Sequence, residues 1–128
     1  MHFPEDLYYT KDHEWLKLDE DGTTGIIGIT AFAQQELGDI VFIEIEDEGT
    51  EVSVDDVFGT IEAVKTVSEL FAPVSGVIMA FNTDLESSPE QVNEDPYGKG
   101  WMVKIKLMDT AELDNLLRAD AYSEMVSA

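Results

Sequence analysis

The stretch that decides the fold is Val57–Ala72, which reads VFGTIEAVKTVSELFA. It contains two apolar, strand-like runs, Val57–Val64 and Val67–Ala72, with only Lys65 and Thr66 between them. Two residues are enough for a tight hairpin loop, although the Asn-Gly or Asp-Gly pair typical of such loops is absent. The stretch therefore predicts a β-hairpin that carries Lys65 at its tip, with the amine exposed to water.

Further strand-like segments lie on both sides of this hairpin, separated by Gly, Pro, Asn and Asp, which is typical of an all-β core. They are Glu14–Leu18, Gly25–Thr30, Ile40–Glu46, Gly76–Asn82 and Trp101–Leu107. Alternation of apolar and polar residues predicts which side chains share a face in two of them. In Ile40–Glu46, Val41, Ile43 and Ile45 should lie on one face, and Glu44 and Glu46 on the other. In Trp101–Leu107, the inward side chains should be Trp101, Val103, Ile105 and Leu107, and the outward ones Met102, Lys104 and Lys106.

Two short helices are expected between the strands. Thr30 is a suitable N-cap for a helix over Ala31–Leu37, and Gly38 is a suitable residue to close it. Ser88 followed by Pro89 is typical of the N-cap and first turn of a second short helix.

A third helix is expected near the C-terminus. Asp109 and Glu112 have the spacing of a capping box with Asp in the cap position. They would open a helix that presents one apolar side, formed by Leu113, Leu116 and Leu117. The sequence thus predicts a mainly β fold with short helices and a C-terminal helix.

Length and charge narrow the possible functions. The chain has 128 residues, 44% of them hydrophobic, which suits one domain over residues 1–128. Its 28 acidic and 7 basic residues give a formal net charge of −21, so nucleic acid and anionic membranes would repel it. A partner with a basic face would be attracted. The same charge also suits solubility or a saline cytoplasm, and both explanations stay open.

The termini and hydropathy bear on location. No apolar run approaches the roughly 18 to 20 residues that span a bilayer. The first ten residues include Glu5 and Asp6 and resemble neither a secretory signal nor a basic transit peptide. We therefore expect a cytoplasmic protein, with a mature mitochondrial form carrying an added Met as the alternative.

Residues that carry enzyme chemistry are sparse. The chain has no cysteine, and its serines and two histidines, His2 and His13, are too scattered for a catalytic triad or a multi-histidine metal site. We expect no catalysis and no metal. Among six lysines, only Lys65 lies at the predicted hairpin tip, where a modifying enzyme can reach it. Its position alone does not distinguish it from an ordinary turn lysine.

The residues that flank Lys65 do distinguish it from an ordinary turn lysine. Val57–Gly76 closely resembles the lipoyl-attachment hairpin of the glycine cleavage system H-protein family. Other blocks follow in the family's order along nearly the whole chain: Tyr9–Trp15 (YTKDHEW), Gly28–Thr30, Ala33–Gln34, Leu37–Phe42, Val92–Asn93, Asp95–Gly98, Gly100–Trp101, Lys104–Lys106, Leu117 and Ala121–Tyr122. The chain departs from the family at three positions. The family usually has Ser at the position of Ala63, and it usually has an Asp near the position of Ala31. Many members have His or Tyr where this chain has Phe32, which puts in doubt a role of position 32 in binding the arm.

This resemblance implies a flattened barrel-sandwich of two antiparallel sheets, as in lipoyl and biotinyl domains, with lipoic acid bound covalently to Lys65. It also implies a non-catalytic carrier, lipoylated by lipoyl-attaching enzymes, that moves the aminomethyl group of glycine from glycine decarboxylase (the P protein) to the aminomethyltransferase (the T protein). Dihydrolipoyl dehydrogenase, the L protein, then reoxidises the arm. No nucleic acid and no membrane are expected among the partners.

Other residues have more modest expectations. By resemblance, Glu14 and Glu69 lie near the docked arm, where a carboxylate can pair with the cationic amine of the loaded group; the alternative is that both are solvated charges. Trp15 and Trp101 are expected in or near the core. His13 is expected to be a hydrogen-bonded structural residue.

The three alternative functions are another kind of carrier (a biotin carrier or a lipoyl domain of a dehydrogenase), a lipoyl-relay donor and an enzyme. Biotin carriers typically have Met on both sides of the modified lysine, whereas Val64 and Thr66 flank Lys65. Lipoyl domains of 2-oxoacid dehydrogenases are shorter and lack both the Trp15 motif and the C-terminal helix. An H-like protein that mainly donates lipoyl groups to other enzymes is not separable by sequence. An enzyme is disfavoured because no nucleophile, base and orienting partner occur together.

Overall fold

The structure, a computed structural model, describes residues 2–127 and contains two antiparallel β-sheets. Met1 and Ala128, which the expected domain includes, lie outside the described residues. The larger sheet has the order β1-β2-β3-β9-β8-β5. Its strands are Tyr8–Tyr9 (β1), Glu14–Leu18 (β2), Thr24–Ile29 (β3), Glu51–Val52 (β5), Gly76–Phe81 (β8) and Val103–Leu107 (β9).

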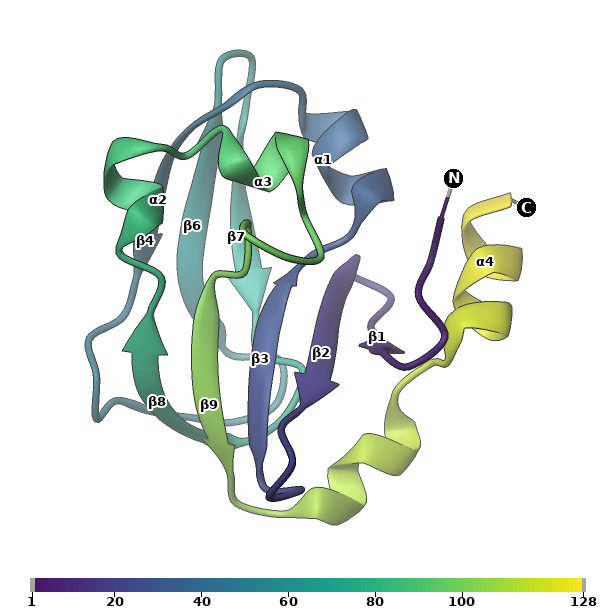
Figure 1. The fold of residues 1–128 in the computed structure, drawn as a ribbon. Coiled ribbons are helices and arrows are strands. Elements are labelled where there is room, and N and C mark those ends of the chain that lie inside the picture. The colour runs from purple at the N-terminus through teal and green to yellow at the C-terminus, as the bar shows by residue number, and fades with distance from the viewer. Residues whose placement is uncertain (1, 128) are drawn as a thin grey trace.

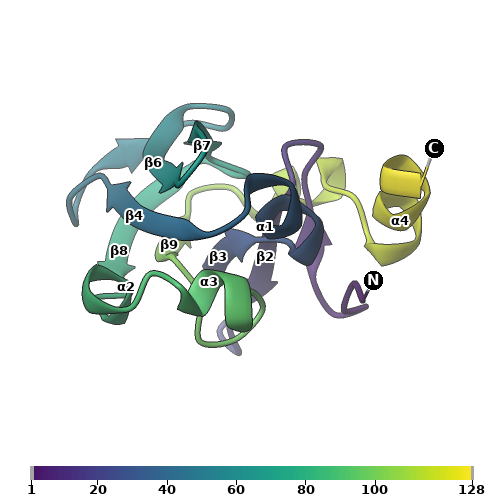
Figure 2. The same ribbon diagram turned by 90° about the horizontal axis from the view of Figure 1, so that it is seen from above.

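The smaller sheet has the order β4-β6-β7 and contains Ile40–Ile45 (β4), Val57–Ala63 (β6) and Val67–Phe71 (β7). Figure 2 shows it facing the larger sheet, with the β6–β7 hairpin at one end of the molecule in Figure 1. The two sheets stay separate instead of closing into a barrel. The predicted mainly β fold of two antiparallel sheets is confirmed.

Short helices connect and flank the strands. They are Ala31–Leu37 (α1), Asp84–Ser87 (α2), Gln91–Glu94 (α3), the 3₁₀ helix Thr110–Asn115 (η1) and Ala119–Ser127 (α4). The bounds predicted for α1 are confirmed: the Thr30 side chain accepts a hydrogen bond from the Ala33 N–H, and Gly38 ends the helix with a φ of 82°. None of the described helices is long and apolar enough to cross a membrane.

Two clusters of buried side chains hold the fold together. The main cluster lies between the sheets and includes Ile27, Ile61, Leu70, Ile78 and Ile105. The second packs the N-terminal segment and α4 against the larger sheet, as Figure 1 shows, and contains Leu7, Tyr9, Trp15, Ala119 and Tyr122, with Trp101 partly buried beside them. The expectation that Trp15 and Trp101 belong in or near the core is confirmed.

The face predicted for Val41 is wrong. In β4 the pairing passes from Ile40↔Ala63 to Phe42↔Glu62, so Val41 is the extra residue of a β-bulge. Ile43 is buried and Ile45 half-buried, whereas Val41 is exposed. A bulge breaks strict alternation, because two residues on one strand face one residue on its partner.

The expected direction of Met102 is also wrong. Strand β9 begins at Val103, and Met102 precedes it with its N–H donating to the carbonyl of Ile27. There Met102 is fully buried instead of pointing outward. The inward positions Val103, Ile105 and Leu107 are confirmed.

The segment around Pro89 differs from its prediction because Ser88 ends α2, with its N–H donating to the carbonyl of Asp84. Helix α3 begins two residues after Pro89, at Gln91. Ser88 therefore does not serve as an N-cap for the expected helix.

The expected C-terminal helix is divided into two. Asp109 caps η1 by accepting from the Ala111 N–H, whereas the Glu112 carboxylate accepts from the N–H and Oγ of Ser75 instead of completing a capping box. Helix α4 follows separately, after Leu116 and Leu117. The three leucines predicted to share one apolar side pack in different places: Leu113 and Leu116 pack on the main core, and Leu117 packs on the second cluster.

Candidate functional site

Lys65 lies in the loop of the β6–β7 hairpin and is exposed. The Ala63 N–H donates to the carbonyl of Thr66 at 2.8 Å, so the two-residue loop is Val64 and Lys65, one residue earlier than predicted. Neither loop residue has a positive φ, which agrees with the absence of the Gly that primed turns need. The predicted hairpin with Lys65 at its tip is confirmed.

Neighbouring segments hold this tip in place. The Val64 N–H donates to the carbonyl of Asp39 at 3.0 Å, which ties the loop to the start of β4. The Asn93 side chain fixes that start, because it accepts from the Ile40 N–H at 2.9 Å and donates to the carbonyl of Gly38 at 2.9 Å. Several backbone bonds thus restrain the backbone on which Lys65 is presented.

A pocket of about 140 Å³ opens beside the hairpin, and both Glu14 and Glu69 line it. Its walls come from the loop before β2, from α1 and from the β6–β7 strands. The lining residues are Asp12, His13, Glu14, Ile29, Ala33, Glu36, Leu37, Ile61, Ser68, Glu69 and Leu70. The structure therefore brings the two predicted carboxyl residues together at one small pocket with apolar walls.

The two carboxyl groups differ in their surroundings. Glu69 is exposed on β7. Glu14 is only 2% exposed, and its carboxyl accepts from the Phe71 N–H at 2.9 Å and the Thr10 hydroxyl at 3.2 Å. Burial raises the pKa of Glu14 to about 8, and the negative charges of Asp12 and Asp55 add to the effect. Glu14 is thus a buried, mostly neutral acid at pH 7, so the alternative of a solvated charge holds only for Glu69.

His13 lines the smaller pocket and is hydrogen-bonded to a residue of α4. Its Nδ1 lies 2.8 Å from the Tyr122 hydroxyl, which also lies 2.8 Å from Oγ1 of Thr30. Its backbone φ of 69° is unusual for a residue other than glycine and turns the chain between Asp12 and Glu14. Burial lowers the pKa of His13. The expectation of a hydrogen-bonded structural residue is confirmed, although His13 also lines the pocket.

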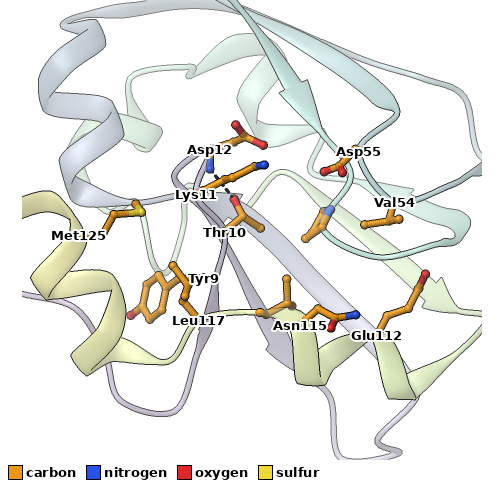
Figure 3. Close-up of a pocket in the computed structure, with 12 residues that line it drawn as sticks. Tyr9, Thr10, Lys11, Asp12, Val54, Asp55, Glu112, Asn115, Leu117 and Met125 are labelled. Carbon is orange, nitrogen blue, oxygen red and sulfur yellow. Dashed lines mark hydrogen bonds between the residues drawn. The ribbon is translucent and has the colours of Figure 1, made fainter.

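A second pocket, of about 410 Å³, lies on the other side of the Thr10–Asp12 loop, between that loop and the η1–α4 segment. Figure 3 shows Lys11 extending from this loop toward Asp55 at the pocket's edge. Neither Lys65, Glu14 nor Glu69 lines it. The expected site residues therefore gather at the smaller pocket.

Sequence reasoning missed two acidic residues, Asp12 and Glu36, that line the smaller pocket. Asp12 precedes Glu14 by two residues, and that proximity was an available signal. Glu36 had a weaker one, because it lies on the exposed side of an expected helix whose orientation the sequence does not fix. Among residues 2–127 no group of three or more His, Cys, Asp or Glu side chains is arranged to hold a metal ion.

Known proteins resemble this chain along almost its entire length. The family model of the glycine cleavage H-protein matches residues 7–128. A glycine cleavage system H protein from Salinibacter ruber is 62% identical over 125 residues, which are 98% of this chain and 99% of that protein. One from Prosthecochloris aestuarii is 60% identical over 126 residues, 98% of each chain. The crystal structure of a glycine cleavage system H protein from Mycobacterium marinum has a TM-score of 0.89 at 35% identity and covers 98% of this chain and 100% of that one.

Two antiparallel sheets that present an exposed lysine on a restrained hairpin define a class of protein, the carrier domains for a lysine-linked prosthetic group. Within this class, the chain belongs to the glycine cleavage H-protein family. It is the non-catalytic lipoyl carrier of the glycine cleavage system and carries lipoic acid covalently on a lysine. It acts together with the other components of that system.

Proposed function

We propose that Lys65 is the lysine that carries the lipoyl group. The observation that supports this most strongly is its place in the two-residue hairpin loop, exposed to solvent while hydrogen bonds hold the surrounding backbone. A Cβ built on Gly38 would lie 3.4 Å from Cε of Lys65, so the lysine side chain runs alongside a residue that has no side chain to obstruct it. The lipoyl group supplies the reactive disulfide, and the protein supplies its placement.

The loaded arm docks in the pocket formed around Glu14 and Glu69. Ser68, Glu69 and Leu70 lie three to five residues along the chain from Lys65, roughly 10–17 Å at the rise of a β-strand. An extended lipoyl-lysine side chain spans about 15 Å, which is of the same order. The apolar walls suit its hydrocarbon chain, and the acidic side chains suit the cationic amine that the arm carries when loaded.

The arm visits three enzymes in turn. It accepts the aminomethyl group of glycine at the P protein, gives its methylene carbon to the T protein and is reoxidised by the L protein, after lipoyl-attaching enzymes have loaded Lys65. Tethering keeps the arm at a high effective concentration near each active site. The protein works in the cytoplasm, where bacterial relatives of this family would meet these enzymes.

A reconstituted system tests the proposal. Lys65→Arg keeps the positive charge at an exposed loop position, so its melting curve should overlay that of the wild type, within about 0.5 kcal/mol. Its guanidinium is not a substrate for acylation, so methylene transfer from glycine should disappear. Lys99→Arg, also at an exposed lysine, is the matched control and should retain transfer. Transfer by the Lys65→Arg variant would refute the assignment.

A further inference from the structure

Several apolar side chains around Lys65 are exposed to solvent. Val64, beside it in the loop, is 75% exposed. The first rung of strand pairing below the loop joins Phe42, Glu62 and Val67 on one face of the small sheet, where Phe42 is 53% and Val67 61% exposed. Exposed apolar groups at one edge of a site are a feature of docking surfaces.

This outer face differs from the face that lines the pocket. Side chains alternate along a strand, so Ile61, Ser68 and Leu70, which line the pocket, point to the opposite side from Glu62, Val67 and Glu69. Apart from Glu69 at the edge, an arm docked in the pocket leaves the outer face free for another molecule.

The charges on this outer face have one sign. The next rung of pairing joins Glu44, Thr60 and Glu69, and Glu62 lies between Phe42 and Val67. Strands β4, β6 and β7 contain no Lys, Arg or His. A partner that covers this surface must therefore supply the cations.

Lysines collect on the far side of the molecule. Strand register places Lys17, Ile26 and Lys104 on one rung of the outer face of the larger sheet, and Lys106 on the next. The larger sheet therefore carries both signs of charge, because Glu51 shares the rung of Lys106 and Asp21 lies 3.9 Å from its amine, whereas the strands of the smaller sheet carry acids without bases. A basic partner approaching from solution is therefore attracted more strongly to the smaller sheet than to the larger one.

We infer that the outer face of the small sheet, with Phe42, Val67 and Val64 as its apolar contacts, is the docking surface for the enzyme that acylates Lys65. This inference rests on the proposed attachment at Lys65. The enzyme meets the surface with apolar side chains set among Lys and Arg residues, around the opening that admits the lysine. Charge complementarity and the continuity of this patch with the modified residue select this occupant over a second copy of the chain, which would bring acid to acid.

The chemistry at that opening is amide formation. The amine nitrogen of Lys65 bonds to the carboxyl carbon of lipoate that ATP has activated as an adenylate. The bond from that carbon to the AMP oxygen breaks, AMP leaves, and the amine loses a proton. The docking surface takes no part in these bonds, so its loss should raise KM and leave kcat nearly unchanged.

The test uses the unmodified full-length chain, a purified lipoate–protein ligase, lipoate, ATP and Mg²⁺, with intact mass as the readout. Phe42→Thr and Val67→Thr, singly and combined, place β-branched residues, which suit exposed strand positions, while removing apolar area. Met79→Thr is the matched control, because Met79 is 50% exposed on the opposite sheet. Melting curves show whether each variant folds. If the variants that contain Phe42→Thr do not fold, the kinetics of Val67→Thr, the most conservative change, decide the outcome.

For the double variant we expect kcat/KM to fall about tenfold through KM, with Met79→Thr within twofold of the wild type. For Val67→Thr alone we expect a fall of about threefold. Values for the decisive variant that match those of Met79→Thr would overturn the inference while leaving lipoylation itself intact. Peptide mapping of the modified wild-type chain that places the mass increment on another lysine would instead refute the proposed attachment at Lys65.

Discussion

Glu14 has a pKa near 8 inside a pocket lined by three other acidic residues, Asp12, Glu36 and Glu69. At pH 7 its carboxyl is mostly neutral, whereas the resemblance implies a charged carboxylate near the docked arm. A cationic amine entering the pocket favours the ionised form, because opposite charges lower the pKa of an acid. The proposed docking of the loaded arm would therefore be coupled to release of the Glu14 proton.

This pairing predicts how long the loaded form survives. Glu14→Gln combined with Glu69→Gln removes both proposed partners of the amine while keeping similar shapes. A charge-assisted hydrogen bond contributes about 1.5–3 kcal/mol, so the lifetime of the loaded form should fall roughly tenfold or more. Release of formaldehyde and ammonia from the loaded protein measures it. Glu44→Gln is the control, because Glu44 lies on the same face of the small sheet as Glu69 but outside the pocket. Equal lifetimes for the wild type, the double variant and the control would show that Glu14 and Glu69 do not hold the amine.

Stability should also report the Glu14 proton. Because the folded pKa is raised from 4.5 to about 8, the proton favours the folded state. Its contribution is complete below pH 4.5 and is lost as the pH rises through about 8. Wild type should therefore lose more than about 1 kcal/mol relative to Glu14→Gln between pH 5 and pH 8 in urea unfolding. Parallel pH profiles for the two proteins would show that Glu14 titrates normally.

At the residue scale, the sequence predicts Lys65 as the attachment site but gives no prediction of the protonation state of Glu14. The lysine stands out because the residues around it, Val57–Gly76, resemble the family's lipoyl-attachment hairpin. The pKa of Glu14 depends on the Phe71 N–H, 57 residues away, and on burial by α1 and the hairpin. Neither contact follows from the pattern around Glu14 itself.

At the scale of elements, Asn93 joins three segments near the hairpin tip. Its side chain bonds to Gln34 in α1, to the carbonyl of Gly38 and to the N–H of Ile40. Asp39, between the last two, accepts from the Val64 N–H. Helix α3 therefore acts on the loop that carries Lys65 through the Gly38–Ile40 segment.

Asn93→Ala should destabilise the fold by about 2 kcal/mol or more, because two backbone groups lose their partners. Amide hydrogen exchange at Ile40 should accelerate at the same time. Asn115→Ala is a suitable control, since no described residue bonds to the exposed Asn115 side chain, and its effect should stay within about 0.5 kcal/mol. Unchanged exchange at Ile40 in the Asn93 variant would contradict this positioning role.

Elements with local signals matched the sequence, and those shaped by distant contacts did not. The bounds of β2 and α1 agree with the alternation and the caps. The bulge at Val41 arises from pairing with β6, and the burial of Met102 from its bond to Ile27 on a neighbouring strand. Glu112 left its expected capping role because Ser75, far away in sequence, offers two donors.

At the scale of the whole molecule, acids dominate the side that carries Lys65, and Lys17, Lys104 and Lys106 lie on the other side. Composition predicted the net charge of −21 but not this separation, which depends on strand register. The uneven distribution favours one orientation of approach to a basic partner.

Association with the P protein should therefore weaken steeply with salt. The Debye length falls from about 10 Å at 0.1 M to 3 Å at 1 M, so the association rate should drop while the dissociation rate changes little. Stopped-flow mixing at a series of NaCl concentrations measures both rates. An association rate indifferent to salt would leave solubility as the explanation of the charge.

Peptide mass spectrometry on protein purified from its native host shows most directly whether Lys65 carries the lipoyl group. Proteolysis at acidic residues separates Lys65 from the other lysines. We expect a lipoyl mass increment on the peptide that contains Lys65 and on no other lysine peptide. An increment on Lys17, Lys99 or any other lysine, with Lys65 unmodified, would contradict it.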